Sequence, residues 1–223
     1  MLQALRNFIV RRTFAYKLRN KGMNMFSSFE NFKAIRKKAE ESRVTEGRKH
    51  EVLYFHKVDD PYSHLTLHYI EKFKNAYDVE FKPILVGEED PTALHEPSLY
   101  TDYCLEDVKR IAPYYSVDFP GANYPEKKLV NKANSILSSV SSEEFAPLAK
   151  IVSHALWSAD SAKLEELETT YKTSEEEVLE NLKKGNEIRN NCDYYFGSAF
   201  YYEKELYWGV DRLNHLEDRL TEL

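Results

Sequence analysis

The sequence predicts an α/β fold in which two halves of one small sheet are separated by a block of helices and preceded by a basic helical extension. Three observations lead to this prediction. After residue 50 the hydrophobic pattern reads strand, helix, strand; a helical period then fills the middle of the chain; and strand, strand, helix closes it. The expected domains are an extension at 1–50, a sheet domain at 51–103 and 190–223, and an all-helical insertion at 104–189.

Composition supports a folded chain and shows a strong division of charge. Hydrophobic residues make up 42% of the 223 residues, and a chain of this length buries about 70% of its unfolded surface. Residues 1–50 carry 13 Lys+Arg and 4 Glu, net +9, whereas 51–223 carry 18 Lys+Arg and 33 Asp+Glu, net −15. No apolar run approaches the roughly 20 residues of a membrane span, and no secretory signal is evident. We therefore expect a cytoplasmic protein with no transmembrane segment and no nucleic-acid partner.

The basic extension is expected to form two helices. Apolar residues three and four apart, beginning at Leu2 and Leu5, predict a first helix that stops at Gly22. A second helix is expected from about 28 to 41, followed by a linker at 43–50. An acid-free, Arg-rich start is also typical of organellar transit peptides and of helices that bind a membrane surface. The interpretation that the opposite charges favour is that the arm packs on its own acidic body or on another subunit, as in a homo-oligomer.

The first half of the sheet is expected at 51–58 and 79–86, where β-branched and aromatic residues are concentrated. Between these strands, 61–76 has the pattern of a helix. A crossover this short predicts parallel strands in one βαβ unit. The segment 87–103 is polar and contains prolines, so we expect a loop there.

The inserted block is expected to contain five helices. Ser-Ser-Glu-Glu at 141–144 and Thr-Ser-Glu-Glu-Glu at 173–177 are typical of helix N-termini, the second as a capping box. The expected helices span 105–115, 125–138, 143–157, 161–171 and 174–188.

The end of the chain is expected to form a hairpin and a final helix. Two short strands, 198–202 and 205–208, are separated by a tight turn at Glu203 and Lys204. Gly209 then ends the hairpin, and Asp211 is expected to cap the last helix.

Two local motifs support this predicted order of strands and helices. Asp-Pro-Tyr-Ser at 60–63 directly follows the first strand and opens a helix. Phe-Gly-Ser-Ala-Phe at 196–200 is followed by Tyr-Trp-Gly-Val-Asp-Arg-Leu at 207–213. Together they resemble the DsbA-like thioredoxin superfamily, in the branch that contains 2-hydroxychromene-2-carboxylate isomerase and kappa-class glutathione transferases. The resemblance covers about 51–223 and implies a thioredoxin-like fold (βαβ…ββα) with a helical insertion.

The resemblance also implies where a site would lie. In that branch a Ser at the helix start donates a hydrogen bond to the glutathione or substrate thiolate, a cis-proline presents its backbone to glutathione, and the Asp-Arg pair holds the γ-glutamyl end. The residues that match the catalytic positions are Asp60 (the nucleophile position), Tyr62 and Ser63. Those that match the glutathione-binding positions are Ser198, Ala199, Asp211 and Arg212.

Two departures from the pattern change the expected chemistry. Asp60 is neither Cys nor Ser, so with Ser63 the site has no sulfur for dithiol–disulfide exchange. An ionised Asp60 would also repel a thiolate and raise its pKa. Ala199 stands at the cis-proline position, and because a cis bond there costs about 2.5–4 kcal/mol we expect a trans bond.

Three hypotheses for function remain. The first is a member with a degenerate site that binds a small-molecule ligand or another protein without thiol redox catalysis. The alternative is a glutathione-dependent isomerase or transferase, with glutathione as its cofactor. In the third, the chain is one half of a tandem protein whose other half keeps the chemistry.

Other groups of residues give weaker indications of a functional site. Asp60 followed by Pro61 is also a good helix N-cap, which alone would account for both residues. Asp60, His64 and His68 fall on one side of a helix, but no second cluster supplies a further ligand and no metal site is expected. Cys192 precedes the 196–200 loop and could approach the site, whereas Cys104 heads a helix of the insertion. A cysteine at either position is more often a buried, unreactive side chain than a nucleophile.

Overall fold

The structure is a computed structural model that describes residues 14–88, 94 and 96–222. Its contacts divide the chain into two compact units, Met1–Arg48 and Lys49–Leu223, and each unit is described here by itself. No helix in the described part of the chain combines the length and the apolar composition that crossing a bilayer requires.

The N-terminal unit contains two helices, α2 (Phe14–Phe26) and α3 (Phe29–Glu46). The Ser28 side chain caps α3 by accepting a hydrogen bond from the Asn31 N–H, as expected for a serine that precedes a helix. At the other end, Gly47 adopts φ 64° and its N–H reaches the carbonyl of Val44, the left-handed ending that glycine favours.

Two boundaries expected for this unit are wrong. α2 continues through Gly22 instead of stopping there, because a glycine inside a helix costs only about 1 kcal/mol relative to alanine. Residues 43–46, expected as linker, are the last turn of α3, which ends at Gly47. Residues 2–13 of the first expected helix lie outside the described residues.

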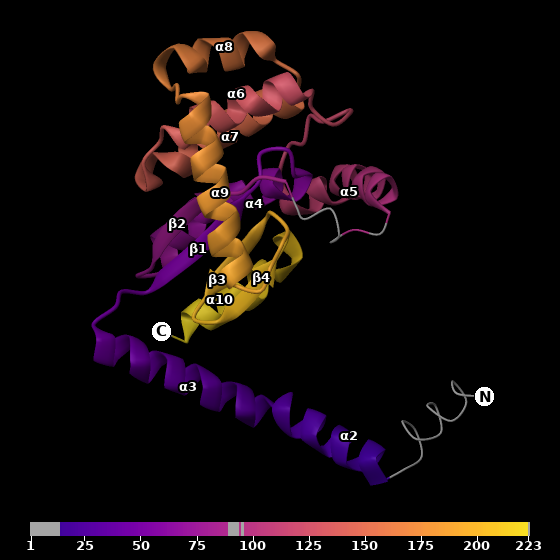
Figure 1. The fold of residues 1–223 in the computed structure, drawn as a ribbon, viewed down its shortest axis with the longest axis vertical. Helices are drawn as coiled ribbons and strands as arrows, with labels where there is room; N and C mark the ends of the chain where they lie inside the picture. Colours follow the sequence, from indigo (N-terminus) through magenta and orange to yellow (C-terminus); the bar gives the residue numbers. More distant parts are fainter. Residues whose placement is uncertain (1–13, 89–93, 95, 223) are drawn as a thin grey trace, which may run out of the picture. The chain divides into compact units, whose positions relative to one another are not determined.

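The second unit is built on one four-stranded sheet (Figure 1). Its strands are β1 (Glu51–His56), β2 (Glu80–Leu85), β3 (Ala199–Tyr202) and β4 (Glu205–Trp208), in the order β2-β1-β3-β4. β1 is parallel to β2 and antiparallel to β3, and β3 is antiparallel to β4. The expected strands and the expected parallel βαβ unit are therefore confirmed, with ends that differ by one or two residues. Glu203 and Lys204 both have positive φ, which matches the two-residue hairpin turn expected there.

Alternate side chains of β1, β2 and β3 enter different cores. Val52 and Tyr54 of β1 face the main core, which also contains residues of α4 (Pro61–Ala76) and α10 (Leu213–Thr221). Phe55 faces the opposite side and packs with Ile84 in a smaller core. That side is crossed by α9 (Glu175–Asn191) (Figure 1). The period of two along the strands thus sets which residues meet which layer.

The helical block contributes to the main core. It comprises α5 (Pro97–Ile111), a 3₁₀ turn (Ala112–Tyr115), α6 (Lys127–Ser138), α7 (Ser142–Trp157) and α8 (Ser161–Thr170). The expected caps are confirmed, since Ser141 accepts from the Glu144 N–H and Ser174 from the Glu177 N–H. The loop expected at 87–103 is wrong over 97–103, because Pro97 occupies the first turn of α5, where its fixed φ suits a helix.

The start of the last helix also differs from expectation. Gly209 leads into a 3₁₀ turn, Val210–Arg212, so that α10 begins at Leu213. Among the described residues no side chain caps the start of α10, and the Asp211 carboxylate instead lies 3.2 Å from the Arg212 guanidinium. The expected Asp211 cap is wrong because the 3₁₀ turn moves the start of α10 to Leu213, so that Arg212 and not Asp211 holds the capping position.

Candidate functional site

Asp60 lies where β1 ends and α4 begins. One of its carboxylate oxygens accepts a hydrogen bond from the Tyr62 N–H at 3.0 Å, and the other accepts from the Ser63 hydroxyl at 3.1 Å. Ser63 is fully buried, and its oxygen in turn accepts from the Lys57 N–H at 3.3 Å. The carboxylate therefore caps the helix and orders its first turn, as proposed from the Asp-Pro sequence.

The loop that precedes β3 lies directly on this carboxylate. A Cβ added at Gly197 would come 2.9 Å from an Asp60 carboxylate oxygen and 2.7 Å from the Lys57 Cβ. Only glycine allows so close an approach of the two segments. Behind it, Ser198 is fully buried with φ 53°, and Ala199 opens β3 opposite Trp208. All peptide bonds of the described residues are trans, which confirms the trans bond expected before Ala199.

A network of buried hydrogen bonds connects β1 to the start of α4. The Tyr54 hydroxyl donates to the Ser63 carbonyl at 3.2 Å and lies 2.8 Å from the Thr66 hydroxyl and 3.0 Å from His56 Nδ1. The Thr66 hydroxyl lies 3.4 Å from that of Ser198, which joins α4 to β3. Burial raises the pKa of Tyr54 far above its ordinary value, so its proton stays in place.

A small cavity of about 70 Å³ opens beside Asp60. One wall is aromatic: the Tyr100 and Phe196 rings stack at 5.4 Å between centroids, and Phe196 stacks on Trp208 at 5.3 Å. Trp208 keeps 40% of its surface exposed. Cys104 completes the lining from α5. An acidic group is thus flanked by flat apolar rings and one thiol.

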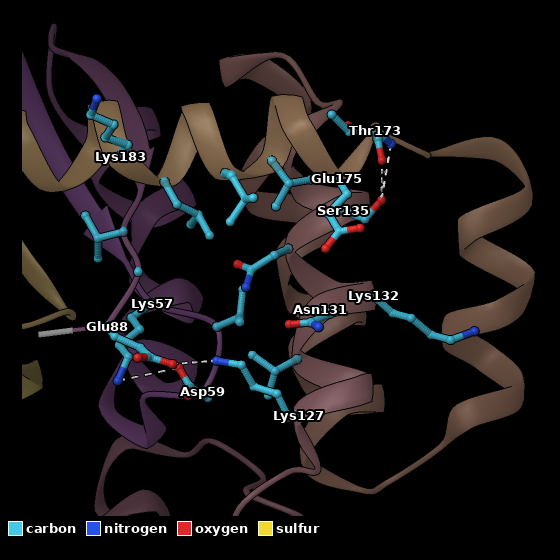
Figure 2. Close-up of a pocket in the computed structure, with 18 of the residues that line it drawn as sticks. Lys57, Asp59, Glu88, Lys127, Asn131, Lys132, Ser135, Thr173, Glu175 and Lys183 are labelled. Carbon is cyan, nitrogen blue, oxygen red and sulfur yellow. Dashed lines mark hydrogen bonds and ion pairs between the residues drawn. The ribbon is translucent and has the colours of Figure 1, made fainter.

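A much larger cavity, of about 930 Å³, lies between α6 and α9 and reaches the turn between β1 and α4 (Figure 2). Lys57 and Asp59 line both this cavity and the small one. The large cavity has an apolar wall and a charged rim. The apolar wall is formed by Val58, Val86, Val130, Val178, Leu179 and Leu182.

Part of the charge at the rim is neutralised within the protein. Lys127 pairs with Glu88 at 2.5 Å, and Lys132 pairs with Glu168 at 3.1 Å and points away from the cavity toward α8 (Figure 2). Asn134 is buried and lines the cavity, and its side-chain oxygen has no hydrogen-bond partner among the described residues. A buried amide without a partner is uncommon in folded proteins.

The architecture is similar to that of solved structures of other proteins. The sequence matches no protein-family model and no curated protein. The structure is similar to that of a 2-hydroxychromene-2-carboxylate isomerase, with a TM-score of 0.58 and 18% identity over 77% of this chain and 95% of the other. It is also similar to a candidate protein disulfide isomerase from Nitrosomonas europaea, with a TM-score of 0.55 and 14% identity over 78% and 98%. The fold is therefore a DsbA-like thioredoxin fold. It confirms the fold class expected from the sequence.

In this DsbA-like fold the two cysteines lie in different places from those expected. Cys104, in the middle of α5, lies at the small cavity, whereas Cys192 packs against the smaller core near the end of α9. Burial raises the pKa of the Cys104 thiol to about 11, with the nearby Asp60 charge acting in the same direction. The Cys104 thiol is thus neutral at pH 7 and weakly nucleophilic.

Sequence reasoning missed the site face of α5, which carries Tyr100, Cys104 and Asp107. Tyr100 and Cys104 line the small cavity, and Asp107 accepts a hydrogen bond from the Tyr62 hydroxyl at 2.7 Å. Burial raises the pKa of Tyr62, which keeps this donor protonated. The spacing of these three residues, four and then three apart, is that of one helix face and would have shown them once Pro97 was recognised as a helix start.

The remaining candidate residues lie outside the two cavities. Asp211 and Arg212 are exposed and pair with each other. His64 is buried, with Nδ1 at 2.9 Å from the Ser153 hydroxyl and Nε2 at 2.8 Å from the Asp118 carbonyl, so both ring nitrogens are engaged. In the described ranges no three acidic, His or Cys side chains are grouped as metal ligands.

The capping geometry predicts how substitutions at Asp60 behave. Asp60→Ala should lower the free energy of unfolding by about 1–2 kcal/mol, whereas Asp60→Asn, an equally good cap, should change it by a few tenths. Urea unfolding measures both. Asp160→Ala removes the comparable cap of α8, whose carboxylate accepts from the Lys163 N–H at 2.9 Å, and serves as the reference. Equal losses for Ala and Asn at residue 60 would contradict the capping role.

Proposed function

We propose that this protein is a non-redox DsbA-like protein that binds an amphipathic small molecule in the cavity between α6 and α9. The observation that carries the proposal is this cavity of about 930 Å³, which begins at the turn that holds Asp60. Its volume falls in the range of small-molecule sites, roughly 300–1,000 Å³.

The lining indicates the chemistry of the ligand. Val178, Leu179 and Leu182 form an apolar strip along α9, and Val130 faces them from α6. Leu179 is 62% exposed at this surface. Charged groups at the rim and the Asn134 amide can orient polar ends of a bound molecule. A ligand with a largely apolar skeleton and one or more polar groups fits this lining.

Three features of the site support the absence of thiol redox chemistry. Asp60 stands where the resemblance places the nucleophile, and the Ser63 hydroxyl donates to it. The thiol at the small cavity, Cys104, is buried and neutral at pH 7. Because exchange requires a thiolate and a second sulfur, these residues do not form a dithiol centre.

A second candidate is a glutathione-dependent isomerase or transferase. The likeness to a 2-hydroxychromene-2-carboxylate isomerase, which extends over 95% of that chain, favours it. Against it, the hydroxyl of Ser63 is buried and donates to Asp60, and that of Ser198 is buried beside Thr66. A glutathione thiolate next to the Asp60 carboxylate would also have a raised pKa.

Thermal unfolding with millimolar ligands distinguishes the two candidates. The panel contains decanoate and naphthoate as amphipathic acids and reduced glutathione. A ligand at 100 times its dissociation constant stabilises the folded state by about 2.7 kcal/mol, or roughly 5–10 °C for a chain of this size. We expect a shift with an amphipathic acid and none with glutathione; a shift with glutathione alone would support the second candidate.

A cavity variant ties any shift to this site. Leu179→Trp places a larger side chain at the exposed apolar wall and should abolish the ligand-induced shift. Leu99→Trp changes an equally exposed leucine of α5 outside the cavity, with 68% exposure against 62%, and should leave the shift unchanged. An unchanged shift in the Leu179 variant, or no shift with either acid in the native protein, would contradict the proposal.

A further inference from the structure

The N-terminal unit exposes an unusual amount of apolar surface. α3 has 18 residues and none of them is buried. Phe29 is 66% exposed and Met25 is 68% exposed, so neither helix forms a core for the other. Large apolar side chains that are exposed on these two helices are Leu18, Met23, Met25, Phe29, Phe32, Ile35 and Val44. So many large apolar side chains exposed on two successive helices are typical of an interaction site.

Three exposed apolar side chains of α3 share one side of the helix. Phe29, Phe32 and Ile35 are spaced three residues apart and lie along one side of the helix. Cations accompany the rings: Lys33 Nζ lies 4.6 Å from the centre of the Phe29 ring, and the Arg36 guanidinium lies 4.4 Å from that of Phe32. In α2, Arg19 stands 5.5 Å from the centre of the Tyr16 ring. Aromatic rings and positive charges therefore occupy the same surface.

The charge of these two helices is also unevenly distributed along the chain. α2 contains Lys17, Arg19 and Lys21 and no acidic residue. The acidic residues of α3 are concentrated toward its end, where Glu40 pairs with Arg43 at 2.6 Å. Positive charge thus prevails in α2 and in the first half of α3, beside the exposed phenylalanines. A polyanionic surface with an apolar layer beneath it complements this pattern.

We propose that the arm, defined as residues 14–47, binds the surface of an anionic membrane. Phe29, Phe32 and Ile35 enter the boundary between headgroups and acyl chains, while Lys33 and Arg36 contact lipid phosphates. Helices of this kind lie in the interface rather than crossing it, which agrees with the absence of a membrane-spanning helix among the described residues. Aromatic residues stacked with cations suit a layer that is apolar on one side and charged on the other.

Vesicle sedimentation of the full chain tests the proposal. The protein is mixed with vesicles of phosphatidylcholine alone, or of phosphatidylcholine with 30 mol% phosphatidylglycerol, and the pelleted fraction is measured. We expect binding to the anionic vesicles and little to the neutral ones. Raising the salt from 0.1 M to 1 M shortens the Debye length from about 10 Å to about 3 Å and should weaken binding strongly.

A double variant, Phe29→Ser with Phe32→Ser, tests the apolar face. Its partition onto anionic vesicles should fall at least about tenfold, because two aromatic rings no longer enter the bilayer. Its thermal unfolding midpoint should stay unchanged, since no residue of α3 is buried. Ile151→Ser removes a similarly exposed apolar side chain from α7, 47% against 39% for Phe32, and should bind like the native protein.

Three results would overturn the proposal. Equal binding to neutral and anionic vesicles, or no binding to either, would contradict the attraction of the arm to anionic lipids. Unchanged partition of the double variant would show that the phenylalanines do not enter the membrane. A lower unfolding midpoint or a smaller mass in sedimentation equilibrium for the double variant would show instead that the arm packs on the body or on a second copy.

Discussion

The free energy of unfolding should fall by about 4 kcal/mol between pH 7 and pH 5. His56 and His64 are each 1% exposed, and burial lowers the pKa of His56 to about 3 and that of His64 to about 4. In the unfolded chain both titrate near 6.5. Below that pH the unfolded state binds two protons that the folded state does not, so acid favours unfolding. The loss begins near pH 6.5 and continues toward the folded pKa values.

Urea unfolding at pH 7, 6 and 5 measures this effect. His56→Gln and His64→Gln each remove one titrating group, so each should reduce the decrease between pH 7 and 5 by about half. His215→Gln, at an exposed position, serves as the reference His-to-Gln substitution. The slope with pH is the readout, because either buried substitution also changes stability at pH 7. A native protein whose stability varies by less than about 1 kcal/mol over this range would contradict the prediction.

Gly185→Ala should destabilise the protein by about 3 kcal/mol. A Cβ at this position of α9 would lie 1.8 Å from the Leu85 carbonyl oxygen and 3.2 Å from the Ile84 Cγ2. The obstacle is backbone of β2, which cannot change rotamer, so α9 must move away from the sheet. Because α9 forms the wall of the large cavity, the same variant should also weaken the ligand-induced thermal shift.

Chemical denaturation of Gly185→Ala is compared with that of Gly87→Ala. A Cβ at Gly87 would meet the Asn186 Nδ2 at 3.5 Å and the Leu182 Cβ at 3.7 Å, both ordinary contacts. We expect this control to change the free energy of unfolding by less than about 1 kcal/mol. A loss of less than 1 kcal/mol for the Gly185 variant would show that α9 adjusts its position at little cost.

Features that depend on neighbouring residues could be predicted from the sequence. Ser141 and Ser174 cap helices because each hydroxyl reaches an N–H three residues away. The β-branched and aromatic residues concentrated at 51–58 predicted β1, and the two-residue turn at 203–204 set the hairpin. The role of Asp60 as a cap follows from Asp before Pro in the same way.

Features that join distant segments were decided only by the tertiary structure. Cys104 reaches the site from 44 positions after Asp60, Gly197 closes over Asp60 from far along the chain, and Gly185 allows α9 to touch β2. The large cavity is lined by α6 and α9 together with the β1–α4 turn, three segments that are far apart in the sequence. Local propensity acts over about four residues, whereas these contacts depend on how whole elements pack. The sequence by itself determined the elements, their order and the cap at the site; packing determined which side chains meet there and the cavity that lies beside it.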